Sequence, residues 1–121
     1  MGATGLAADP AEYRTRLDEH DDAQIDAWAS ELMRDIAIRR GVIRVLTNFR
    51  SATGLDDRSL ERVYAAGGGP PATLGRDAQG RLMVPAISLY CLVAGIRREM
   101  PDGRARLIAY LVENFEDLVY V

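Results

Sequence analysis

The chain has 121 residues, 48% hydrophobic and 27% charged, a size and balance that fit one compact domain with a single core. Its formal net charge of −3 weighs against a free-standing nucleic-acid binder, because phosphate binding is normally carried by a basic surface. The single cysteine, Cys91, excludes an internal disulfide or a cysteine-rich zinc site within one chain, and its apolar neighbours indicate a buried thiol.

The N-terminal third predicts a tail and two helices. Residues 1–8 are small and featureless, so we expect a tail, followed by one helical domain over residues 9–121. A short helix is expected from Pro10, because proline suits a first helical turn. The acidic run at 18–22 interrupts the apolar pattern, and a long amphipathic helix follows that ends near Gly41. Its apolar face would contain Ile25, Trp28, Ala29, Leu32, Met33 and Ile36.

Residues 42–71 have the outline of a helix-turn-helix. Two apolar-periodic segments flank Gly54, which can adopt the positive φ that a tight turn between helices often needs. The GGGPP segment would end the second helix, since glycine caps a helix and proline cannot extend it. The same spacing occurs in helical hairpins that never bind DNA. The side chains expected to face inward are Val42, Ile43, Val45, Leu46, Phe49, Leu60, Val63 and Tyr64.

The C-terminal half predicts a small β-element and two helices. Residues 73–84 carry turn-forming residues between short apolar ends, which indicates a short β-hairpin or an ordered loop. A hairpin could be the wing of a winged helix with Arg76 and Arg81 at its tip, whereas a loop would leave both in water. The apolar stretch 86–96 could be a buried helix or a buried strand, and its length and the stop that follows it favour the helix. The last segment is amphipathic, and its apolar end at 119–121 would be covered by the core or by another chain.

The patterns of common catalytic sites are missing from the sequence. His20, the single histidine, lies in the acidic run, where we expect a surface side chain. The GGGPP segment lacks the lysine and hydroxyl residue of a phosphate-binding loop. We therefore expect a non-enzymatic protein without cofactor or metal. Since no apolar leader and no apolar run of about 18–20 residues occurs, we also expect a soluble, cytoplasmic protein without membrane contact.

All 15 basic side chains are arginine, a bias that a GC-rich bacterial genome would produce. The absence of lysine excludes a lysine nucleophile, a Schiff base and a phosphate-loop lysine. The arginines supply planar guanidinium groups that can bind carboxylates or phosphates. Residues 9–35 contain nine acids and three arginines, whereas residues 36–62 contain six arginines and three acids. Positive charge is therefore concentrated on the candidate helix-turn-helix.

Four short segments follow one another along the chain: TGLDDRSLERVY, GGGPP, then, after a turn-rich stretch and Pro85, SLYC at 88–91 and DGRARLIAY at 102–110. This succession, over about residues 41–110, resembles the helical part of the C subunit of the bacterial flagellar master transcription activator. The resemblance implies a helical DNA-binding activator subunit that works in a hetero-oligomer with a D-type partner subunit. That family also carries a four-cysteine zinc site beyond these helices, and with one cysteine here we expect no zinc site to carry over.

The first functional hypothesis is a helix-turn-helix transcriptional regulator that binds double-stranded DNA as a dimer or with a partner subunit. The helix over about 57–66 would enter the major groove. Asp57 and Glu61 share its exposed face and would repel phosphate. The side chains expected to contact DNA are Arg58, Ser59 and Arg62 on this helix, Arg39, Arg40, Arg44 and Arg50 on either side of it, and Arg76 and Arg81 on the candidate hairpin.

The alternative hypothesis is a helical protein–protein interaction module, such as an adaptor or an immunity-like protein, that binds no DNA. The acidic N-terminal helices or the apolar C-terminus would contact the partner. The two hypotheses differ in the surroundings of Arg58 and Arg62. Ion pairs with neighbouring acids under a covering C-terminal segment would exclude groove entry, whereas one open positive face would permit it.

Overall fold

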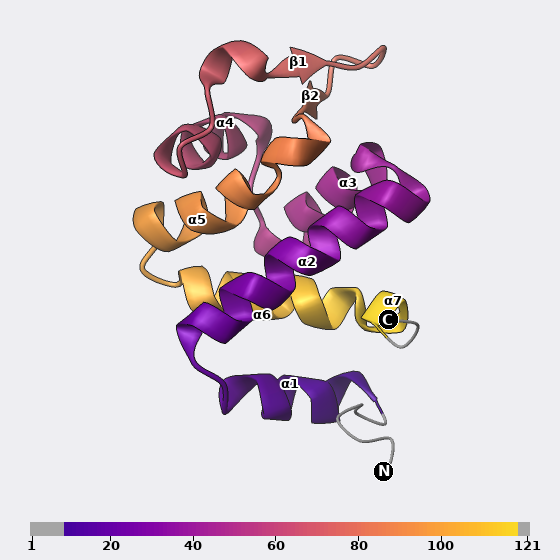
Figure 1. Cartoon of the computed structure of the whole chain (residues 1–121), viewed down its shortest axis with the longest axis vertical. Coiled ribbons are helices and arrows are strands. Elements are labelled where there is room, and N and C mark those ends of the chain that lie inside the picture. The colour runs from indigo at the N-terminus through magenta and orange to yellow at the C-terminus, as the bar shows by residue number, and fades with distance from the viewer. Residues whose placement is uncertain (1–8, 119–121) are drawn as a thin grey trace.

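The computed structural model describes residues 9–118, which form a mainly helical fold with one two-stranded sheet, as the sequence predicts (Figure 1). Among the described residues no helix is both long and apolar enough to cross a membrane. The elements in chain order are α1 (Pro10–Asp18), α2 (Asp22–Arg40), α3 (Val42–Thr53), α4 (Asp57–Ala66), the 3-10 turn η1 (Pro71–Thr73), β1 (Gly75–Arg76), β2 (Leu82–Met83), the 3-10 turn η2 (Ala86–Ser88), α5 (Tyr90–Glu99), α6 (Gly103–Glu113) and α7 (Phe115–Leu118).

Aspartate caps set the starts of three helices. The side chains of Asp9, Asp21 and Asp56 each accept a hydrogen bond of 2.8 Å from the backbone N–H three residues on. Such a cap satisfies a donor that has no partner inside the helix, and its loss costs about 1 kcal/mol. The acidic run at 18–22 therefore separates α1 from α2 because it supplies the cap of α2.

The core lies around α2, which contacts α3, α5 and α6 (Figure 1). The predicted apolar face of α2 is buried except for Trp28, which is partly exposed and meets the ring of His20 edge-on. His20 is exposed, as expected. The predicted inward position of Ile43 is wrong, since 46% of this residue is exposed. Ile43 lines up along α3 with Thr47 and Arg50, away from the stripe that the buried Val45 and Phe49 form.

Helices α4 and α5 cross at two glycines. A Cβ placed on Gly95 would overlap the carbonyl oxygen of Val63 and lie 2.6 Å from its carbonyl carbon. A Cβ on Gly67 would overlap the carbonyl oxygen of Cys91. Both backbones therefore approach to a distance that only glycine permits. Cys91 is buried at this crossing, as predicted.

The stretch expected as one fully buried helix over residues 86–96 differs from that prediction. It begins with η2 after Pro85, and α5 starts only at Tyr90. Ile87 and Tyr90 are 86% and 59% exposed, although Leu89 between them is buried. The expected tail at 1–8 and the apolar end at 119–121 lie outside the described residues.

Ion pairs fasten α5 and α6 to the start of α2. Arg104 donates to Asp22 at 2.8 Å, and Arg97 pairs with Asp22 at 3.1 Å and with Asp26 at 2.7 Å. The hydrogen bond from Arg104, together with the charge of Arg97, holds the pKa of Asp22 below its ordinary value. Asp22 therefore favours the folded state only while its carboxyl is ionised.

We expect Asp22→Asn to destabilise the protein at neutral pH but not in acid. Since the folded pKa lies below the unfolded one, the contribution of Asp22 is complete above the unfolded pKa and is lost as the pH falls through the folded pKa. Urea unfolding of the wild type and the variant should show a stability difference that shrinks below about pH 4. A difference independent of pH would contradict a role for the charge.

Candidate nucleic-acid interface

The candidate interface is built on the turn between α3 and α4. Gly54 has a φ of +71° and ends α3, and Asp56 then caps α4. Leu55, at 7% exposure, and Leu60, at 0%, are buried in the core and so anchor the turn there. The Arg106 guanidinium of α6 donates to the carbonyl of Thr53, a residue of the last turn of α3. The helix–glycine–helix outline predicted from the sequence is thus present, and the hydrogen bond from Arg106 joins it to α6.

Residues 73–84 form the hairpin, one of the two predicted alternatives. Strands β1 and β2 are antiparallel, with Arg76 paired to Leu82. Asp77 organises the turn, since its carboxylate accepts from the backbone N–H groups of Gln79 and Arg81 at 2.9 and 2.8 Å and from Arg81 Nε at 2.7 Å. The N–H of Arg81 is the main reason that the pKa of Asp77 lies below its ordinary value.

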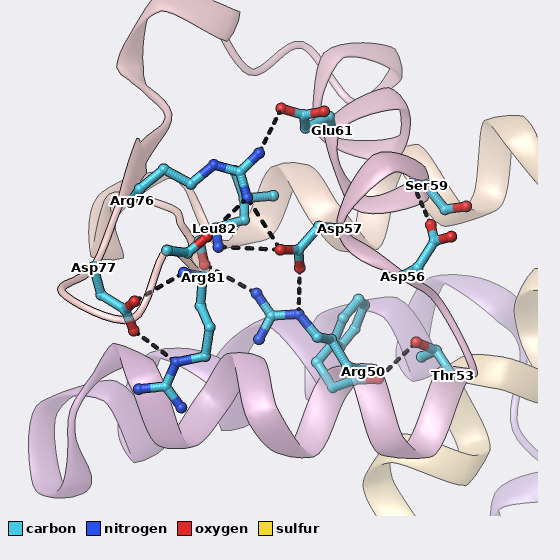
Figure 2. A network of polar contacts seen from close by, with 12 residues as sticks. Arg50, Thr53, Asp56, Asp57, Ser59, Glu61, Arg76, Asp77, Arg81 and Leu82 are labelled. Carbon is cyan, nitrogen blue, oxygen red and sulfur yellow. Dashed lines mark hydrogen bonds and ion pairs between the residues drawn. The ribbon is translucent and has the colours of Figure 1, made fainter.

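The winged-helix alternative places Arg76 and Arg81 at the tip of the hairpin, whereas Arg76 lies in β1 and both arginines bind acids of this chain. Arg81 is bound to Asp77 of its own hairpin. Arg76 reaches α4, where it pairs with Asp57 at 3.0 Å and with Glu61 at 3.5 Å (Figure 2). Two acids one turn apart on α4 attract the guanidinium of Arg76, which faces them from the neighbouring strand.

Asp57 is the centre of this polar network. Besides Arg76, its carboxylate accepts from Arg50 Nε at 2.8 Å and from the backbone N–H of Leu82 at 3.3 Å (Figure 2). Arg50 also donates to the carbonyl of Leu82 at 3.0 Å. The network joins α3, α4 and the hairpin, and it uses Arg50 for structure rather than leaving it available to phosphate.

We expect Asp57→Ala to lower the free energy of unfolding by about 1–2 kcal/mol, because it leaves Arg50 without its acid and the Leu82 N–H without its acceptor. Urea unfolding measures the loss, and amide hydrogen exchange should show faster exchange at Leu82. Asp35→Ala is the matched control, since within residues 9–116 the Asp35 side chain has no polar partner. Equal losses in both variants would argue against the network.

The outward face of α4 carries Arg58 and Arg62. Both are exposed, they lie one helical turn apart, and neither forms a hydrogen bond or ion pair with any of residues 9–116. The opposite face, with Leu60, Val63 and Tyr64, is buried and packs against α5. The two arginines are therefore open to solvent and form no ion pair, but their charges help to lower the pKa of Asp56 at the start of α4.

Ser59 differs from its two arginine neighbours. It is partly buried, and its backbone N–H donates a hydrogen bond to the Asp56 carboxylate. Its backbone N–H is the main cause, and its hydroxyl a further cause, of the lowered pKa of Asp56. Ser59 thus has a role in the helix cap, and its contact with DNA stays a prediction.

Arg39, Arg40 and Arg44 lie at the junction of α2 and α3, at the far end of α3 from α4 (Figure 1). All three are exposed. Arg39 Nε donates to the carbonyl of Asp35 at 3.3 Å, and Arg44 has no polar partner in the part of the chain that the structure describes. The predicted arginines therefore separate into an α4 group, a junction group and the internally bound Arg50, Arg76 and Arg81.

Sequence analysis missed the pairing of the two acids of α4 with Arg50 and Arg76. The residues are 7 to 19 positions apart, across a turn and a loop, so no short-range pattern reveals the contacts. Among the side chains of residues 9–116, no three of His, Cys, Asp or Glu are placed to hold a metal ion. Comparison with protein-family models, curated proteins and solved structures finds no match to this chain.

Proposed function

We propose that this protein is a helix-turn-helix DNA-binding transcriptional regulator in which α4 enters the major groove. The observation that carries the proposal is that Arg58 and Arg62 are exposed on one face of α4 and form no hydrogen bond or ion pair within residues 9–116, although the charges of both reach the Asp56 carboxylate. Arginine donates two parallel hydrogen bonds to guanine or to phosphate. Their spacing of one turn suits contact with neighbouring positions along one groove.

The pairing of Asp57 and Glu61 removes an objection raised by the sequence. Unpaired acids beside Arg58 and Arg62 would repel phosphate. Arg50 and Arg76 bind Asp57, and Arg76 also contacts Glu61, so both carboxylates have cationic neighbours on the hairpin side of α4. The cost of bringing this helix to a polyanion is therefore lower than the sequence suggests.

The junction arginines supply the contacts to the DNA backbone in this proposal. With 12 residues, α3 is about 18 Å long, which exceeds the roughly 12 Å width of the major groove. Arg39, Arg40 and Arg44 would thus contact phosphates beyond the groove that α4 enters. The resemblance to the flagellar activator C subunit includes Arg58 and Arg62 and adds support for a regulator that works with a partner subunit.

A titration of random-sequence duplex at low and moderate salt tests the proposal. Five exposed arginines predict a logarithmic salt slope of about −4.5, since each phosphate contact contributes roughly −0.9. Binding should be weak at moderate salt, because one copy has few cationic contacts. Absence of binding at low salt would refute autonomous DNA binding.

A second candidate function, a protein–protein interaction module, is favoured by a different observation. Ile38, Ile87 and Tyr90, all strongly exposed, line one groove away from the α4 arginines. Exposed apolar side chains gathered in one place are typical of an interaction site. If DNA does not bind at low salt while a partner occupies this groove, the interaction module is the better account.

A further inference from the structure

A groove of about 440 Å³ lies between the second half of α2 and the segment from η2 into α5. Among residues 9–116, whose side chains the structure describes, four large hydrophobic side chains are exposed, and three of them line this groove: Ile87 at 86%, Ile38 at 76% and Tyr90 at 59%. The buried Leu89 forms part of its wall. The concentration of exposed apolar surface in one groove indicates that another surface covers it.

The groove also carries a pair of opposite charges on its α2 side. Glu31 and Arg34 are exposed, lie three residues apart and both line the groove. Their spacing permits an ion pair within α2, yet neither side chain has a polar partner in the described range. Both charges are therefore available to a molecule that occupies the groove.

We propose that a second copy of this chain occupies the groove, in a twofold dimer. An isologous interface needs a patch that is complementary to itself. One acid and one base beside an apolar centre meet that requirement, because Glu31 of each copy can face Arg34 of the other. The same balance gives a strongly acidic or strongly basic partner no preference.

In this arrangement, Ile38 and Ile87 of each copy are covered by the apolar residues of the other, and the two ion pairs set the register. The groove is lined by none of the α4 residues, so both α4 helices would keep their arginines free. The dimer does not rest on DNA binding. If the proposed function holds, it doubles the arginines presented to the duplex.

Sedimentation equilibrium of the full chain, from low-micromolar to near-millimolar concentration, tests the dimer. The wild type should change from the 13.3 kDa monomer toward twice that mass as concentration rises. Ile87→Asp should weaken association about tenfold or more, since it places a charge in the apolar centre. Ile43→Asp is the matched control, because Ile43 is exposed but lies outside the groove, and it should leave association unchanged.

Charge reversal tests the register. Glu31→Arg and Arg34→Glu should each weaken self-association. In a dimer of either variant, the side chains at positions 31 and 34 of the two copies carry charges of the same sign and repel each other. An equimolar mixture of the two variants should restore the dimer, since every contact then joins opposite charges. This restoration cannot arise from misfolding of either variant.

A wild type that stays at 13.3 kDa throughout would overturn the proposal and leave the groove to a different partner. Equal effects of Ile87→Asp and Ile43→Asp would overturn it too, because the groove would not be the interface. A mixture that fails to restore the dimer would overturn the twofold register. DNA titration of Ile87→Asp separates this proposal from the preceding one, since monomers should still bind DNA, only more weakly.

Discussion

Gly95→Ala is expected to lower the free energy of unfolding by about 3 kcal/mol or more, near or above the usual upper cost of overpacking a core. The added methyl would overlap the carbonyl oxygen of Val63, which is backbone and cannot rotate away. That carbonyl also accepts from the N–H of Gly67 at 3.0 Å, so displacing it would disturb the end of α4. Domains of this size have roughly 5–15 kcal/mol of stability in all.

Urea or thermal unfolding followed by circular dichroism measures this loss. Gly75→Ala is the control, since a Cβ there meets nothing within 4 Å and the backbone φ is not positive, and it should change stability little. Gly67→Ala should behave like Gly95→Ala, because its Cβ would overlap the carbonyl of Cys91. If Gly95→Ala unfolds at the wild-type midpoint, α4 and α5 do not cross as closely as described.

Arg58→Ala and Arg62→Ala are each expected to weaken duplex binding about tenfold, a change of about 1.4 kcal/mol. A contact to phosphate would also reduce the magnitude of the logarithmic salt slope by roughly 1, whereas a contact to a base would reduce discrimination between sequences. Both side chains are exposed and unbonded within the described structure, so neither change should affect the unfolding midpoint.

Arg14→Ala controls for the change in net charge. Arg14 is exposed on α1 and has no polar partner among the residues described, and α1 and α4 lie at opposite ends of the molecule (Figure 1). Titrations at one fixed salt concentration should show wild-type affinity for Arg14→Ala. Equal losses in all three variants would mean that binding depends on total charge rather than on α4.

Much of the helical framework could be predicted because its determinants are local. Gly54 with its positive φ and the GGGPP stop set the limits of α3 and α4 within a few residues. The apolar spacing identified Leu60 and Val63 as inward-facing because a helix repeats every 3.6 residues. The exposure of Arg58 and Arg62 follows from the same periodicity.

The long-range contacts could not be predicted, because they depend on how elements meet. Nothing near Gly95 in the sequence shows that a carbonyl of α4 lies against it. The sequence allows Arg76 to lie at the tip of a wing, and only the position of the hairpin beside α4 shows that Arg76 pairs with Asp57. Ile87 and Tyr90 belong to an apolar run that suggests burial, and only the packing of η2 and α5 shows that they stay exposed.

The most direct test of the central claim, that α4 is the DNA-binding element, is a map of backbone amide chemical shifts during titration with a short random duplex. At 13.3 kDa the chain suits such a measurement. The account predicts the largest shifts in residues 57–66, with smaller shifts at the α2–α3 junction around Arg39 and Arg44. Shifts confined to α1 or to the groove of Ile38 and Ile87, or none at low salt, would contradict it.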